Sequence, residues 1–98
     1  EEIYMNYADA TRFLKEMIIT VNDFEDKENS INLTDGSIVE GSAIYLNNLK
    51  IGDDTAENVR VIVKKALTSS FVIGGDYITD EFGTYTIDSE RNLIVFDK

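Results

Sequence analysis

The side chains of this chain that could take part in catalysis are carboxylates, hydroxyls and amines, because its 98 residues include no cysteine and no histidine. Without those two residue types the chain cannot form a disulfide, a thiolate nucleophile or a Cys/His zinc site. A Ser-His-Asp or Cys-His arrangement within the chain is excluded for the same reason. The abundant acid–base groups that remain are carboxylates, with nineteen Asp and Glu against nine Lys and Arg.

The net charge of -10 limits the partners of the chain. Phosphate backbones and anionic membrane surfaces would be repelled, so nucleic acid is not expected as a partner. The longest apolar runs, such as residues 17–19 and 71–73, are far shorter than the roughly 20 residues that cross a bilayer, so no membrane contact is expected from this segment. No residue pattern calls for a cofactor, and the missing cysteines leave the cellular compartment open.

The most acidic stretch, residues 22–29, could suggest a calcium loop. An EF-hand loop needs oxygen ligands at alternate positions, a central glycine and a terminal glutamate, whereas Lys27 stands where a ligand should be. We therefore expect a solvated connection here, with no metal.

The elements that must position any site begin with a helix, expected at about residues 6–18. Asn6 is a suitable N-cap, Asp9 lies in the first turn, and the β-branched run at 18–21 favours an end soon afterwards. Apolar residues recur at helical spacing and form the expected core stripe: Tyr7, Ala10, Phe13, Leu14, Met17 and Ile18.

From Ile31 onward the hydrophobic period changes to two, which predicts strands. Asp35-Gly36 is a strong hairpin signal, because both positions tolerate positive φ. A long strand is expected at 38–46 with a bulge at Gly41, then a short strand at 49–51 between turns at 47–48 and 52–54, and a further strand at 59–63. The pattern is that of a β meander.

The last third of the chain predicts a short central strand at 71–75 that ends in two glycines, one or two helical turns at 76–82, and two closing strands at 84–88 and 93–96. The expected fold class is therefore mainly β: a small closed or partly open barrel with one N-terminal helix and a short helical turn near residues 76–82. A chain of this length has room for one domain, residues 1–98.

The order of these elements resembles the retropepsin-like aspartic proteases, particularly the single-lobe bacterial group, over nearly the whole chain. The likeness rests on short pieces in the family's order, including Ala-Asp-Ala, Lys-Ile-Gly, Asn-Val-x-Val-x-Val and Val-Ile-Gly motifs. These pieces lie at residues 8–14, 34–41, 49–52, 58–63, 72–78, 84–88 and 92–96. The acid-protease fold is what the resemblance implies.

The resemblance also implies an activity and a partner. The family's catalytic Asp should lie just before Ile3, and no residue of this chain inherits that role, so the chain is expected to be a truncated peptidase domain that is inactive alone. A single-lobe chain supplies one Asp and a two-fold partner the second, which makes the homodimer part of the activity. The expected substrate is a peptide or protein.

The resemblance assigns substrate-binding roles to five residues. The hairpin formed by Thr34, Asp35, Gly36 and Ser37 would be the flap over an extended peptide, and Gly74 would let the strand before it approach the loop that carries the Asp. The alternative is that each glycine simply serves a turn. Without its first hairpin, the barrel is expected to leave edges exposed and the 72–73 strand without one neighbour, which predicts edge-to-edge self-association.

Two tripeptides mimic the catalytic motif and are set aside. Asp54-Thr55-Ala56 follows Gly52-Asp53 instead of a buried apolar strand, so a turn is expected there. Thr34-Asp35-Gly36 has the wrong order and sits at a hairpin tip. Two other hypotheses stay open: a non-catalytic β-barrel module for peptide binding or dimerisation, and an unrelated small all-β module that matches by chance.

Overall fold

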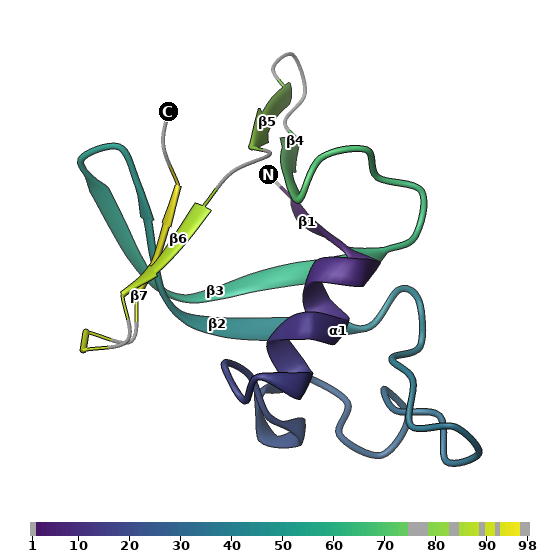
Figure 1. Cartoon of the computed structure of the whole chain (residues 1–98). Helices are drawn as coiled ribbons and strands as arrows, with labels where there is room; N and C mark the ends of the chain where they lie inside the picture. The colour runs from purple at the N-terminus through teal and green to yellow at the C-terminus, as the bar shows by residue number, and fades with distance from the viewer. Residues whose placement is uncertain (1, 75–78, 83–84, 89, 92, 97–98) are drawn as a thin grey trace.

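The structure, a computed structural model, describes residues 2–74, 79–82, 85–88, 90–91 and 93–96. Its main feature is one seven-stranded sheet that curls around a single α-helix (Figure 1). The elements in chain order are β1 (Glu2–Asn6), α1 (Tyr7–Lys15), the short 3-10 helix η1 (Val21–Asp23), β2 (Ala43–Ile51), β3 (Asp54–Lys64), β4 (Phe71–Gly74), β5 (Thr79–Phe82), β6 (Tyr85–Asp88) and β7 (Leu93–Phe96).

The strands follow the order β5-β4-β1-β3-β2-β7-β6. The β2–β3 hairpin forms the middle of the sheet, and β1 and β7 pair with its two sides in parallel. The remaining strands add antiparallel partners at either end. The result is a half-barrel, so the expectation of a mainly β, partly open barrel with one N-terminal helix is confirmed at that level.

The β2–β3 hairpin bends sharply and divides the sheet into two arms (Figure 1). Leu46 and Leu49 both belong to the buried core, although residues three apart on a flat strand face opposite sides. Across from them Asn58 has a φ of 52°, in the left-handed region that asparagine tolerates better than most residues. The bend at Asn58 therefore turns both halves of the hairpin toward the same interior.

Helix α1 begins as predicted and ends three residues early. The Asn6 side chain accepts a hydrogen bond from the Ala8 N–H at 2.8 Å, which confirms the N-cap. At the other end Met17 has a φ of 61°, and the Ile18 N–H donates to the Phe13 carbonyl at 2.9 Å, a Schellman closure. Met17 is consequently 78% exposed, and its assignment to the core stripe was wrong.

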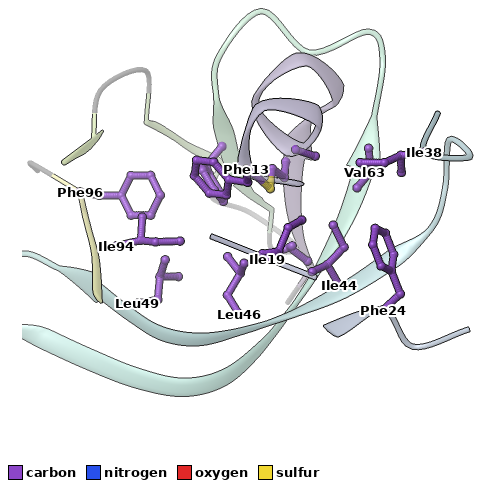
Figure 2. Packing of buried hydrophobic residues seen from close by; sticks show 14 residues of the cluster. Phe13, Ile19, Phe24, Ile38, Ile44, Leu46, Leu49, Val63, Ile94 and Phe96 are labelled. Carbon is purple, nitrogen blue, oxygen red and sulfur yellow. The ribbon is translucent and has the colours of Figure 1, made fainter. Parts of the chain in front are cut away.

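The core lies between α1 and the concave side of the sheet (Figure 2). Phe13 on the helix contacts Tyr85 of β6 edge to face, with ring centroids 5.4 Å apart, and Phe71 contacts Phe96 at 4.4 Å. These rings join the two arms through the interior. The buried cluster is Met5, Ala10, Phe13, Ile19, Phe24, Ile38, Ile44, Leu46, Leu49, Val61, Val63, Phe71, Ile94 and Phe96.

Several strand boundaries differ from the sequence-based expectation. The strand expected at 38–46 begins only at Ala43, and Gly41, with a φ of 89°, lies in a turn instead of a bulge. The turn expected at 47–48 is absent, because β2 runs through both residues and Asn48 pairs with Glu57 of β3. The β3 strand is correspondingly longer than 59–63, and β1 was not predicted at all.

The helical turn expected near residues 76–82 is wrong for the part that the structure describes. Thr79–Phe82 is strand β5, which pairs antiparallel with β4 from Gly74↔Thr79 to Phe71↔Phe82. These residues form a strand because they pair with the apolar strand β4. This non-local pairing overrides their local propensity for a helical turn. Residues 75–78 lie outside the described residues.

Candidate functional site

The four predicted flap residues form a tight turn, as the Asp-Gly signal indicated. The Asn32 N–H donates to the Ser37 carbonyl at 2.7 Å, and Gly36 has a φ of 74°. The turn is closed by a single antiparallel bridge between Ile31 and Ile38. The hairpin turn is therefore confirmed, without regular strands on either side of it.

The polar side chains of this turn serve the turn itself. The Asp35 carboxylate accepts hydrogen bonds from the Ser37 hydroxyl at 2.6 Å and from the Ser37 N–H at 2.9 Å. These two bonds, the hydroxyl first, lower the pKa of Asp35. Thr34 and Asp35 are exposed, and the neighbouring Leu33 is 96% exposed. The turn thus presents the exposed Leu33 side chain beside the Asp35 carboxylate, whose ionised form is favoured by Ser37.

Gly74 lies at the end of β4, in the interior of the sheet. It pairs with Glu2 of β1 on one side and with Thr79 of β5 on the other. The prediction of a central strand is confirmed, and the expectation that the 72–73 segment lacks a neighbour was wrong, because β1 and β5 flank it. The sheet instead ends at β5 and β6.

The structure does not bring the turn and Gly74 together. In Figure 1 the long connection between η1 and β2, which contains the turn, lies at the lower right, whereas β4 lies at the top of the sheet. Thr34, Asp35, Gly36 and Ser37 therefore form one group and Gly74 stands apart from it within this chain.

The tripeptide Asp54-Thr55-Ala56 starts β3, directly after the turn at Gly52 and Asp53. Gly52 has a φ of 61°, which explains the glycine at this position. The three residues are exposed on the strand. The expected turn is confirmed for Gly52 and Asp53, and Asp54 belongs to the strand.

A polar cluster that sequence reasoning missed joins the predicted solvated loop to the sheet. Glu25 accepts hydrogen bonds from the Arg60 guanidinium at 3.0 and 3.1 Å and from the Tyr45 hydroxyl at 2.9 Å. Its neighbour Phe24 is buried and bridges Ile44 of β2. The lone aromatic in a polar run was the only sequence signal for this anchor, and Arg60 lies 35 residues away.

The cluster borders a polar hollow of about 260 Å³ that is lined by residues from the loop and from the start of β2. Glu40, on its rim, already accepts the Lys65 N–H at 2.6 Å, and the buried Ser30 hydroxyl donates to the Asp26 carbonyl. The hydrogen bonds of Glu40 and Ser30 therefore hold the loop in place. Within the described residues no group of three or more Asp or Glu side chains is placed to hold a metal ion.

The Glu25 cluster predicts a pH-dependent contact. The Arg60 hydrogen bond, followed by that of Tyr45, lowers the pKa of Glu25 below its ordinary value of 4.5. A lowered folded-state pKa means that the contact stabilises the fold fully above the ordinary pKa and is lost as the pH falls through the folded-state pKa.

We expect Arg60→Gln to return the Glu25 pKa toward its ordinary value, read by NMR titration of the Glu25 side-chain carboxyl carbon. Tyr45→Phe removes the weaker cause and should give a smaller rise. Equal pKa values in the wild type and in Arg60→Gln would contradict the bidentate contact.

None of the described helices is both long enough and apolar enough to span a membrane. No family model matches the chain, and neither a curated protein nor a solved structure shows significant similarity to it.

Proposed function

We propose that this chain is the body of one subunit of a retropepsin-like aspartic endopeptidase that hydrolyses peptide bonds as a homodimer. The observation that supports this most is the position of the Val72-Ile73-Gly74 strand. It lies inside the sheet beside β1, with Gly74 opposite Glu2. The resemblance expects the loop that carries the Asp beside this glycine, and the start of β1 is the segment that pairs with Gly74 here.

The order of the other elements supports the same proposal. A helix follows directly after the first strand, a glycine turn at Gly36 follows the helix, and a long hairpin precedes the Val-Ile-Gly strand. A closing hairpin of β6 and β7 ends the described chain. In this proposal, two copies of the half-barrel together form the complete two-fold protease body.

The proposed chemistry needs two carboxylates close enough to repel each other, so that they share one proton. The ionised member takes a proton from a water molecule that attacks the scissile carbonyl, while the protonated member polarises that carbonyl. Each subunit supplies one Asp, and in this proposal it comes from outside residues 1–98. The turn at Thr34–Ser37 would then cover substrate bound to the partner's side of the dimer, since Gly74 lies elsewhere in its own chain.

The test compares residues 1–98 with the full-length protein on denatured globin between about pH 3 and 7. We expect no cleavage by residues 1–98 and pepstatin-sensitive cleavage by the full-length protein, lost when the Asp of an upstream Asp-Thr/Ser-Gly is replaced by Asn. Sedimentation should show the active form as a dimer. A full-length protein that lacks such an Asp, or that is inactive with it, would refute the proposal.

A non-catalytic module for peptide binding or dimerisation is the second candidate. The observation that favours it is the separation of the turn from Gly74, together with the engagement of Asp35 by Ser37. This candidate predicts peptide binding without cleavage in the full-length protein as well, so the globin assay separates the two.

A further inference from the structure

The link between Asp35 and Gly36 differs chemically from every other aspartyl link in the sequence. It is the only place where glycine follows aspartate, and no asparagine is followed by glycine. Glycine lacks the side chain that elsewhere shields a backbone nitrogen from the carboxyl group of the residue before it. The Asp35 carboxyl carbon and the Gly36 nitrogen are therefore the pair most prone to close a cyclic imide.

The reaction at this link needs no reagent besides water. The Gly36 nitrogen attacks the carboxyl carbon of the neutral Asp35 acid, so that an N–C bond forms, the N–H and C–O bonds break, and one water leaves. Water then adds to the main-chain carbonyl of the imide and breaks its bond to the Gly36 nitrogen. The product is isoaspartate, which has the mass of the starting chain and one more methylene in its backbone.

The surroundings of this link give it no steric protection. Asp35 and Gly36 are both exposed. Apart from its chain neighbours, no described atom lies within 4 Å of the position that a Cβ on Gly36 would occupy. Water can therefore reach the link, and any resistance to the reaction must come from the turn itself.

The turn engages both reacting groups in hydrogen bonds. The Gly36 N–H donates to the Asn32 carbonyl at 2.8 Å. The Asp35 Oδ1 atom accepts the Ser37 hydroxyl at 2.6 Å and the Ser37 N–H at 2.9 Å. The nitrogen and the carboxyl group are thus each held by a partner other than the atom with which they would react.

The Ser37 contacts also favour the form of Asp35 that does not react. An ionised carboxylate is a poor target for the amide nitrogen, because its oxygen needs a proton to leave as water. The Ser37 hydroxyl, then the Ser37 N–H and, more weakly, the charge of Lys65 lower the pKa of Asp35. At neutral pH the neutral acid is consequently rarer in the folded turn than in an unfolded chain.

We propose that Asp35–Gly36 is a modification site at which aspartate converts to isoaspartate, and that Ser37 restrains this reaction while the turn is intact. Opening of the turn releases the nitrogen and the carboxyl group and starts the conversion. The added methylene moves the carboxylate away from the Ser37 donors, so the modified turn does not close in the same way. The inference rests on this turn alone and holds whether or not the chain belongs to a peptidase.

The test follows isoaspartate in residues 1–98 during incubation at physiological temperature and neutral pH. Enzymatic methylation of the new carboxyl group measures its amount, and tandem mass spectrometry of the digested chain locates it. The chain unfolded in guanidinium chloride should convert at Asp35 at least about tenfold faster than the folded chain, the order expected when these hydrogen bonds are lost together.

Three variants test the role of Ser37. Ser37→Ala removes the hydroxyl bond and should raise the rate in the folded chain about two- to tenfold, the range for one hydrogen bond. Ser37→Thr keeps a hydroxyl and should restore the wild-type rate. Thr34→Ala removes a hydroxyl from the same turn but leaves the Asp35 contacts in place, so it should have no effect. Circular dichroism checks that each variant is folded.

Three outcomes would overturn the proposal. The first is an equal rate in the folded and unfolded wild type, which would show that the turn gives no restraint. The second is an equal rate in folded Ser37→Ala and folded Thr34→Ala. The third is the absence of isoaspartate at Asp35 in the unfolded chain. Equal rates of all the variants when unfolded would show that Ser37 acts through the turn and leaves the intrinsic reactivity unchanged, in support of the proposal.

Discussion

Replacing Phe13 with alanine should lower the free energy of unfolding by about 3–5 kcal/mol, the range for removing a buried aromatic side chain. Phe13 is fully buried, and its ring contacts Tyr85 on the far arm of the sheet. Domains of this kind are stable by only about 5–15 kcal/mol, so the variant should lose a large part of its stability. Urea denaturation followed by far-UV circular dichroism measures the loss.

Met17→Ala is the matched control for Phe13→Ala. Met17 lies four residues further along, directly after the C-cap of the same helix, and its side chain is exposed. Its removal should change the free energy of unfolding by less than about 0.5 kcal/mol. A loss under about 1 kcal/mol for Phe13→Ala, or an equal loss for both variants, would contradict the placement of the core beneath α1.

Replacing Phe24 with alanine should cost about 3 kcal/mol and release the connection between α1 and β2. Phe24 is 2% exposed, and its backbone bridges Ile44 while the Glu25 N–H donates to the Ala43 carbonyl at 2.9 Å. Without the ring, Glu25 is no longer held against Arg60. Hydrogen exchange should accelerate at the amides of residues 24–25 and 39, and the Glu25 pKa should rise toward its ordinary value.

Val21→Ala is the control for the loop variant, because Val21 lies in η1 and is largely exposed. It should leave both the exchange rates and the Glu25 pKa close to those of the wild type. Unchanged exchange in Phe24→Ala would show that the hydrogen bonds of the polar cluster hold the loop without the aromatic anchor.

Local signals in the sequence were sufficient for the elements that begin or end on a specific side chain. The cap at Asn6 and the turns at Gly36 and Gly52 depend on hydrogen bonds or φ angles of residues next to one another in the chain. The closing strands β6 and β7 likewise lie within the ranges 84–88 and 93–96 that were predicted for them. Each of these features could therefore be predicted from its own few residues.

The elements that sequence reasoning missed depend on partners far along the chain. β1 is five residues long and is held by β3, 58 residues away, and by β4, 66–72 residues away. Asn47 and Asn48 have turn propensity, yet both lie in β2, where Asn48 pairs with Glu57 of β3. Thr79–Phe82 becomes a strand because β4 offers it an edge.

The candidate site also contains one part that is specified locally and another that depends on distant residues. The turn at Thr34–Ser37 was predictable, because Asp-Gly specifies it locally. The contact of Glu25 with Arg60 was not, because the two residues lie 35 positions apart and meet only in the folded chain. The peptidase activity and the role of Gly74 stay predictions.

The left-handed conformation at Asn58 has a consequence for how this molecule could diversify. The apolar side chains on both sides of the bend share one interior only while residue 58 holds this torsion. Residues that tolerate a positive φ, chiefly asparagine, aspartate and glycine, are therefore the ones expected at this position.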